Sequence, residues 1–189
     1  MFVRSGRLAA IVALAVCTLV PAASLSPSAE ARVKAKTNAK SEAKAKATQI
    51  ARGKYLANLS GCNDCHTPGY FLGKPDMTRY LAGSEVGFEI PGLGVFHGPN
   101  LTPDKETGLG RWTDKQIVAA LKKGVRPDGR VLAPIMPWRA LASLTPQDTQ
   151  AMVAYLRSIP AVKNKVPGPF GPSEKPTSFV MKIVPPAGK

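Results

Sequence analysis

Thiol and imidazole side chains are scarce in this sequence, which holds three cysteines and two histidines in 189 residues. A structural zinc site would have to use Cys62, Cys65, His66 and His97, and adjacent ligands such as Cys65 and His66 are unusual for zinc. The chain also lacks the alternation of strands and helices that surrounds a Cys-x-x-Cys motif in thiol oxidoreductases. Zinc binding and thiol or disulfide chemistry are therefore disfavoured alternatives for this motif.

Long apolar segments are equally scarce, because only the stretch from Leu8 to Val20 is continuously uncharged and largely apolar. As a helix it would rise about 20 Å, short of the roughly 30 Å hydrocarbon core of a bilayer. Arg4 and Arg7 precede it and small residues follow, an order typical of a secretory signal peptide. We predict a signal peptide over residues 1–31, cleaved between 22 and 31, export to a bacterial periplasm, and no transmembrane span in the mature chain. A retained anchor is the less favoured alternative.

Acidic residues are few, and the formal net charge is +14. Residues 32–48 hold six basic residues and one acidic residue, alternating Lys with Ala and offering no apolar face. Such a segment has nothing to bury, so we expect a disordered or only fleetingly helical linker over 32–48. A nucleic-acid tail is disfavoured because no aromatic residue is present for base stacking. Peripheral association with an anionic membrane remains an alternative.

The remaining chain has an average globular composition, with 44% hydrophobic and 20% charged residues, which argues against wholesale disorder. Its many Gly and Pro residues argue against a helical bundle or long strands. Three helices are expected: one over Gln49–Ser60, one from an N-cap at Thr113 to Gly124, and one from an N-cap at Thr145 to a stop at Pro160. The sequence therefore predicts a mainly α fold.

Between the first two helices lies a long segment, residues 67–111, punctuated by Gly and Pro. Val86–Ile90 and Val95–Phe96 could pair as a short β-hairpin across an intervening Pro-Gly-Leu-Gly turn. A long connection with little regular structure inside a compact domain is usually functional. We therefore expect this loop to fold around a bound group.

The motif Cys62-Asn63-Asp64-Cys65-His66 has the spacing of a covalent c-type haem attachment site. Two thiols on one turn can reach the two vinyl groups at one porphyrin edge, and the adjacent imidazole is then aimed at the iron. Thioether bonds retain the cofactor in an exported protein that could not recapture it. We expect one covalently attached haem c per chain.

A second axial ligand decides between an electron carrier and a catalyst. Met136 lies between Pro134 and Pro137, which stiffen the loop that would hold its thioether against iron. His97 is the alternative ligand, and an open or His97-ligated position would favour a haem enzyme or a sensor. The remaining candidates, Met77, Met152 and Met181, are weaker. Met152 falls on the apolar face of the third helix, and Met77 and Met181 lie in segments without distinguishing features. With His/Met ligation both axial positions of the iron are filled, and the reduction potential is raised relative to bis-His ligation, as in electron carriers.

The chain resembles the class I c-type cytochromes over Gln49–Pro160, and more narrowly the cytochrome subunits of membrane-associated alcohol, aldehyde and gluconate dehydrogenases. The resemblance implies a class I fold of three or more short helices around one haem, with a cytochrome domain over 49–162. The proline-rich sequence beyond it predicts an extended tail over 163–189, which could wrap the domain or bind a partner subunit. A single Cys-x-x-Cys-His motif rules out a three-haem subunit. The residues that carry the resemblance are 62–66, 98–112, 124–130, 134–137 and 152–157.

The resemblance also implies roles for individual residues. Cys62 and Cys65 would form the thioether links, His66 would be the proximal iron ligand and Met136 the distal one. Pro99 would offer its carbonyl to the His66 ring and fix its orientation. The implied function is that of an electron-transfer protein rather than an enzyme, with a dehydrogenase as donor and another cytochrome or a terminal oxidase as acceptor.

Four further side chains are candidates for contacts with the haem propionates, since their polar hydrogens could satisfy buried carboxylates. They are Arg111, Trp112, Trp138 and Arg139. The equally weighted alternative is that the two tryptophans belong to the core and the arginines are solvated.

Overall fold

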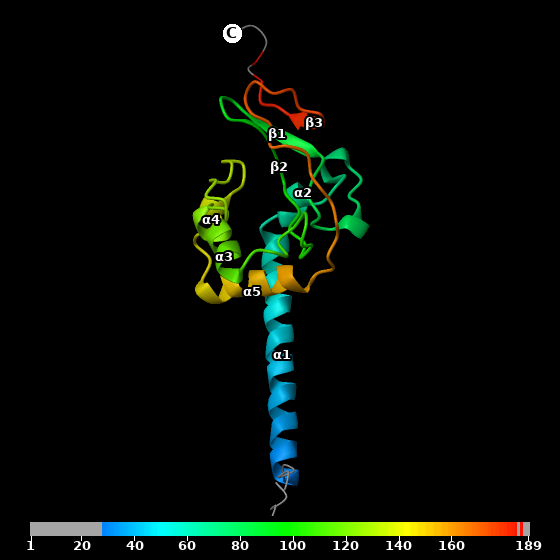
Figure 1. The fold of residues 1–189 in the computed structure, drawn as a ribbon, viewed down its shortest axis with the longest axis vertical. Coiled ribbons are helices and arrows are strands. Elements are labelled where there is room, and N and C mark those ends of the chain that lie inside the picture. The colour runs from blue at the N-terminus through cyan, green and yellow to red at the C-terminus, as the bar shows by residue number, and fades with distance from the viewer. Residues whose placement is uncertain (1–27, 185, 187–189) are drawn as a thin grey trace, which may run out of the picture. The chain divides into compact units, whose positions relative to one another are not determined.

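The computed structural model describes residues 28–184 and 186, so the predicted signal peptide lies outside the described residues as far as position 27. Contacts divide the chain into two units, residues 1–38 and 39–189. The described chain is mainly helical, as the sequence predicted, with one small sheet (Figure 1). The elements are α1 Ala29–Leu59, α2 Cys62–His66, β1 Val86–Ile90, β2 Gly94–His97, α3 Asp114–Lys123, α4 Trp138–Leu141, α5 Pro146–Ser158 and β3 Phe179–Met181, with 3-10 turns at Tyr70–Leu72 and Met77–Arg79.

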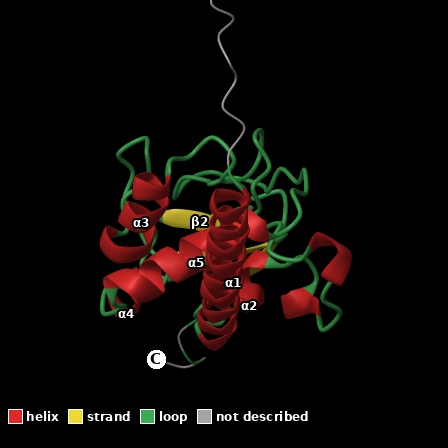
Figure 2. Ribbon diagram, turned by 90° about the horizontal axis from the view of Figure 1, so that it is seen from below, coloured by secondary structure: helices red, strands yellow, loops and turns green. Residues whose placement is uncertain are grey.

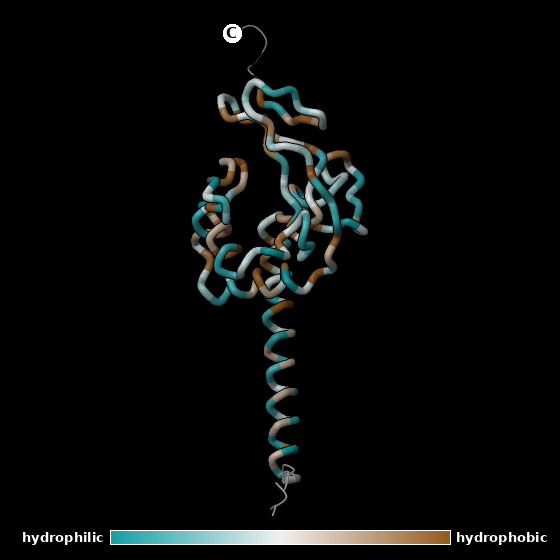
Figure 3. Tube along the Cα trace, in the orientation of Figure 1, coloured by the Kyte–Doolittle hydropathy of each residue, from teal (hydrophilic) through white to brown (hydrophobic). Residues whose placement is uncertain are grey.

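Residues 32–48 differ from the expected disordered linker, because the structure places them within α1. Every side chain from Glu30 to Gln49 is exposed, so packing does not hold this part of the helix. Figure 3 shows polar and weakly apolar residues alternating around it without a continuous apolar stripe. Ala and Lys are both strong helix formers. Intrinsic propensity, which the prediction ranked below the missing apolar face, accounts for the difference.

The C-terminal turns of α1 pack against α5, which crosses them in Figures 1 and 2. Gly53 permits the close approach, since a Cβ there would overlap the Ala151 carbonyl oxygen and lie 2.7 Å from Tyr155 Cβ. Arg52 Nε donates to Asp148 Oδ1 at 2.8 Å beside this contact. The crossing buries Leu56 and its neighbours in the core that lies beneath the functional site.

The two amphipathic helices begin and end where the sequence predicted. Thr113 caps α3 in a capping box, in which Gln116 N–H donates to Thr113 Oγ1 at 3.3 Å and Thr113 N–H donates to Gln116 Oε1 at 2.8 Å. Gly124 ends α3 at φ +66°, a conformation that favours glycine. Thr145 caps α5 through its side chain, which accepts from the Asp148 N–H at 3.1 Å.

The predicted hairpin is present and belongs to a three-stranded sheet with the order β2-β1-β3. β1 and β2 pair antiparallel, with Phe88 opposite Phe96, and β1 and β3 pair parallel, with Val86 opposite Phe179. β3 comes from the Pro-rich tail, so the expected extended tail returns to the hairpin and adds a strand. Among the residues that the structure describes, none of the helices is both long and apolar enough to cross a membrane.

Candidate functional site

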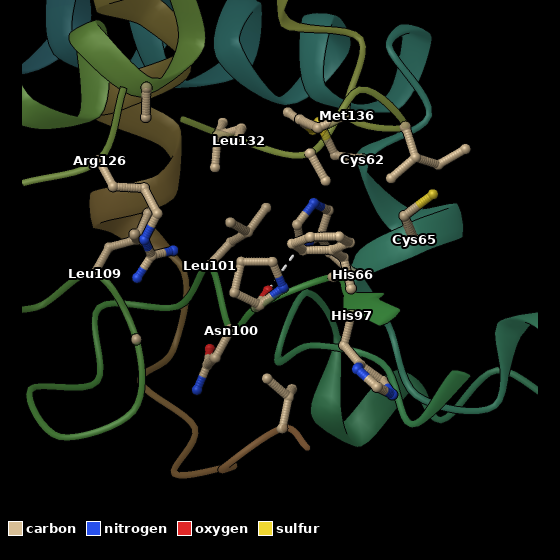
Figure 4. Close-up of a pocket in the computed structure, with 18 of the residues that line it drawn as sticks. Cys62, Cys65, His66, His97, Asn100, Leu101, Leu109, Arg126, Leu132 and Met136 are labelled. Atoms are coloured by element: carbon tan, nitrogen blue, oxygen red, sulfur yellow. Dashed lines mark hydrogen bonds between the residues drawn. The ribbon is translucent and has the colours of Figure 1, made fainter. Parts of the chain in front are cut away.

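A cavity of about 880 Å³ lies within the second unit, at the meeting point of α2, the β1–β2 hairpin, α3, α5 and their loops (Figure 4). This volume is in the range of small-molecule and cofactor sites, which are concave and mostly apolar. Most of its lining is apolar, including Phe88, Phe96, Leu101, Leu109, Trp112, Ile117, Leu121, Leu132, Leu141 and Leu156. The 67–97 segment thus contributes one wall through its hairpin.

Both cysteines of the Cys-x-x-Cys-His motif line this cavity. They are free thiols, held one helical turn apart in α2. Burial raises the pKa of Cys62 to about 11 and also raises the pKa of Cys65. Thiol oxidoreductases need the reverse, a thiol whose pKa is lowered toward neutrality. The raised thiol pKa values therefore argue against a role in thiol–disulfide exchange.

His66 is the most firmly held side chain of the motif and is 4% exposed. Its Nδ1 lies 2.7 Å from the carbonyl oxygen of Pro99, and because a carbonyl only accepts, Nδ1 carries the proton. Burial lowers the pKa of His66, which favours the neutral ring. The Nε2 lone pair is thereby left free on a ring that lines the cavity, the arrangement that an iron ligand requires.

The backbone beside His66 is packed too closely for any side chain. A Cβ on Gly98 would overlap the Cys65 carbonyl oxygen and lie 3.3 Å from His66 Nδ1. The Gly83 N–H donates to the His66 carbonyl oxygen at 2.8 Å from the opposite segment. The strand that ends at His97 and the α2 helix are thus locked together, which places Pro99 within reach of the ring.

Two of the candidate methionine ligands line the cavity and two do not. Met136 and Met152 line it, whereas Met77 and Met181 are exposed and outside it. Met152 is 1% exposed on α5 and packs in the core, as its place on the apolar face of the helix suggested. Met136 is half-buried in the loop before α4, where its N–H donates to the Ala133 carbonyl at 3.0 Å. Of the two, Met136 is the thioether on a loop rather than in a packed helix.

His97 lines the edge of the same cavity but is engaged elsewhere. Its Nε2 lies 2.7 Å from Ser178 Oγ in the C-terminal tail, and its ring meets the Phe170 ring edge-on at 6.0 Å. Its Nδ1 is buried without a hydrogen-bond partner among the residues that the structure describes, and burial lowers the pKa of His97. His97 thus joins the hairpin to the tail.

The structure separates the candidate propionate contacts. Trp112 lines the cavity, whereas Arg111, Trp138 and Arg139 do not. Arg111 is exposed, and Arg139 stacks on the Trp138 ring at 4.6 Å. The Trp138 ring is drawn away because it packs on the backbone of Gly124 at the end of α3. Only Trp112, of these four, is placed to touch a group in the cavity.

Arg126 is a cavity residue to which the sequence assigned no role. Its guanidinium lies over the Trp112 ring at 5.2 Å, and its buried Nε has no hydrogen-bond partner within the described chain (Figure 4). Asp128 Oδ2 approaches this Nε only to 3.5 Å. A buried guanidinium N–H without an acceptor is costly unless a bound carboxylate satisfies it. The sequence signal for Arg126 was its place two residues after Gly124, where a helix is predicted to end. Nothing in the neighbouring sequence distinguished Arg126 from Arg130.

Together these groups fit a covalently held haem better than a bare metal ion. Two thiols, a neutral imidazole, a thioether and a guanidinium whose Nε–H has no hydrogen bond within the described residues line one apolar cavity. By contrast, within residues 28–184 and 186, no three His, Cys, Asp or Glu side chains gather as a metal-ion site. The donor set therefore suits a flat, mostly apolar group that brings its own iron and carboxylates.

Comparison with known proteins agrees with this donor set. The family model described as cytochrome c matches residues 50–160. The chain is 38% identical over 121 residues to the cytochrome c subunit of a quinone alcohol dehydrogenase from Gluconobacter oxydans, which covers 62% of this chain and 23% of that protein. It is 36% identical over 113 residues to the fructose dehydrogenase cytochrome subunit of Gluconobacter japonicus, an alignment that covers 58% of this chain and 22% of that protein. It is 32% identical over 106 residues to the gluconate 2-dehydrogenase cytochrome c subunit of Pantoea cypripedii, which covers 56% of this chain and 22% of that protein. The chain thus spans less than a quarter of the length of these relatives.

Proposed function

Because the chain belongs to the cytochrome c family, which implies covalent haem c and electron transfer, we propose that it is a periplasmic monohaem cytochrome. It would carry single electrons from a dehydrogenase to another cytochrome or a terminal oxidase. The observation that carries the proposal is the His66 ring, buried on the cavity wall with its proton directed to Pro99 and its second nitrogen free. One Cys-x-x-Cys-His motif provides for one haem.

The proposed ligand set is His66 Nε2 and Met136 Sδ, with thioether links from Cys62 and Cys65. When bound, the haem supplies reversible one-electron exchange between ferric and ferrous iron. The chain's own contribution is positional. Pro99 holds the His66 ring in one orientation, the apolar lining excludes water, and Arg126 offers its free Nε–H to a carboxylate.

The proposed partners follow from charge as well as from the relatives. Residues 49–189 hold eighteen basic and ten acidic residues. Four basic side chains line the cavity, at Arg126, Arg130, Lys163 and Lys165, against two acidic ones, at Asp64 and Glu106. A positive surface around the cofactor steers acidic partners and raises association rates. We expect the rate of reduction by a partner dehydrogenase to fall as salt concentration rises, and salt-independent rates would exclude steering.

Visible spectroscopy of the exported holoprotein tests the assignment. Haem that stays with the polypeptide through acid–acetone extraction demonstrates covalent attachment, and the weak far-red band of sulfur-ligated ferric iron demonstrates Met136 ligation. Retained haem without that band would indicate an open or His97-ligated position and would favour an enzyme or a sensor. Absence of haem after expression with a competent attachment system would overturn the proposal.

Variants of the three candidate ligands that line the cavity, Met136, Met152 and His97, identify the distal iron ligand. Met136→Ala should abolish the far-red band and allow added imidazole to bind. Met152→Leu is the matched control, since it removes the other cavity thioether while nearly preserving core volume. His97→Gln should leave the band unchanged. A band lost in either control and kept in Met136→Ala would contradict the proposed ligand set.

A further inference from the structure

The C-terminal tail contributes part of the cavity wall. Residues 163 and 165–169 line the cavity, although they lie beyond residue 160, where the match to the family model ends. We call residues 162–182 the strap. Within it, Val166 packs so closely on the loop before the hairpin that a Cβ on Gly83 would overlap Val166 Cγ1. The strap is therefore packed against the walls that hold the cofactor.

Buried hydrogen bonds attach the beginning of the strap to the loop that carries Pro99. Asn100, 2% exposed, donates from Nδ2 to the Val162 carbonyl at 2.7 Å. The Val162 N–H donates back to Thr102 Oγ1 at 3.1 Å, and the Asn164 N–H donates to Thr107 Oγ1 at 3.0 Å. Satisfied buried polar groups of this kind fix one geometry. The strap and the Pro99 loop therefore form one hydrogen-bonded network.

A second set of contacts attaches the end of the strap to the hairpin. Phe170 and Val95 exchange backbone hydrogen bonds of 2.9 and 3.0 Å. β3 then pairs with β1, and Ser178 Oγ lies 2.7 Å from His97 Nε2. The strap is thus held at both ends, and residues 165–169 span the cavity edge between the two attachments.

We propose that the strap is a built-in wall of the cofactor cavity that raises the midpoint potential of the bound group by excluding water. The inference rests on the proposed electron-transfer function. The oxidised iron carries one more positive charge than the reduced iron, so water that reaches it stabilises the oxidised form. Solvent exposure and the apolar shell are among the factors that set such potentials. Lys165 is exposed on the strap and lines the cavity, and its positive charge also raises the midpoint potential because it destabilises the more positive oxidised form.

The test compares the full chain with a chain that ends at Val162, both as holoproteins. The truncated chain keeps the Val162 bonds to Asn100 and Thr102. We expect the equilibrium constant for reduction to fall about tenfold, a midpoint potential lower by about 59 mV for a one-electron couple. Amide hydrogen exchange over residues 95–109 should rise at the same time. Unchanged potential and unchanged exchange would overturn the inference.

Full-length variants test the effect of the strap on the midpoint potential if the truncated chain fails to fold. Val166→Gly removes the side chain that packs on Gly83, and should lower the potential in the same direction by a smaller amount. Lys165→Gln measures the contribution of charge alone. Lys182→Gln is the matched control, since Lys182 is a strap lysine that pairs with Glu89 outside the cavity. A shift in Lys182→Gln equal to that in Val166→Gly and Lys165→Gln would overturn a local wall effect.

The two proposals fail in distinguishable ways. If the wild-type chain holds no covalent haem, the proposed function fails. Amide hydrogen exchange over residues 95–109 in the full and truncated chains then still tests whether the strap shields the cavity wall. If the wild-type chain holds haem and the truncated chain has the same potential and exchange, only the strap inference fails.

Discussion

The two sides of the cavity that should supply the iron ligands differ in how firmly the fold holds them. His66 is buried, bonded to Pro99 through its ring and to Gly83 through its carbonyl, and packed on Gly98. Met136 is half-buried in a loop whose neighbour Ile135 is 45% exposed. Its backbone bonds stay within that loop and the start of α4.

This difference predicts that His66 stays bound on one side of the cavity, the fixed side, and that Met136 is released more easily on the other, the yielding side. Local opening is cheapest where few buried contacts would be lost. We therefore expect the bond from Met136 to break before the one from His66 whenever the protein is stressed. Variants on each side of the cavity test this difference in how firmly the ligands are held.

The largest effect should come from Gly98→Ala on the fixed side. The added methyl would overlap the Cys65 carbonyl oxygen, which is backbone and has little freedom to move. We expect a loss of about 3 kcal/mol or more in the free energy of unfolding, the upper end of the range for overpacking. Gly171→Ala is the control, because its nearest contact would be an ordinary 3.6 Å. Denaturant unfolding measures both, and equal losses would contradict a specially tight wall.

A smaller effect is expected from Arg126→Gln, which removes a cavity-lining guanidinium whose Nε–H has no hydrogen bond within the described residues. If it binds a carboxylate of the cofactor, its loss should cost about 1.5–3 kcal/mol of holoprotein stability. Arg139→Gln is matched, since Arg139 also stacks on a tryptophan but lies outside the cavity. Thermal unfolding of the two holoproteins should show the larger shift for Arg126→Gln. The reverse order would remove Arg126 from the site.

Pro134→Ala should weaken only the yielding side. Freeing the backbone of the Met136 loop costs about 0.4–1 kcal/mol through the entropy of the opened chain. The far-red sulfur band should therefore disappear at a lower temperature than in the wild type, still before global unfolding. Pro172→Ala makes the same change in the strap, away from the cavity lining, and should leave the band unaltered. Simultaneous loss of the band and of the fold in the wild type would refute the yielding ligand.

The smallest effect should be a pH dependence of the fixed side through His97. Burial lowers its pKa below the ordinary value of 6.5, so below pH 6.5 the unfolded chain binds more protons than the folded one. Stability should therefore fall on acidification from pH 6.5 down to the lowered pKa. The His97 contribution to the slope should stay below about 1.4 kcal/mol per pH unit, the limit for one proton. In His97→Gln this part of the slope should vanish, which equilibrium unfolding at several pH values can check.

Local patterns determined those parts of the protein whose partners are close in sequence. The Thr113 N-cap, the Gly124 cap and the β1–β2 hairpin all depend on residues a few positions apart, and all were predicted. The same holds for the Cys-x-x-Cys-His motif, where one helical turn carries the attachment chemistry. The exposed half of α1 is the exception among local features, because its Ala and Lys propensity was outweighed in the prediction by the missing apolar face.

Spacing along the chain was enough to predict the mainly helical fold, the family and the motif that would bind haem. Packing between distant segments selects the arginines and the tryptophan that line the cavity, since Arg126 and Arg130 line it with Trp112, whereas Trp138 packs on Gly124. It also decided that the tail is a wall. The bond from Asn100 to Val162 joins residues 62 positions apart, and no local pattern encodes a contact that exists only once the core has brought its two ends together.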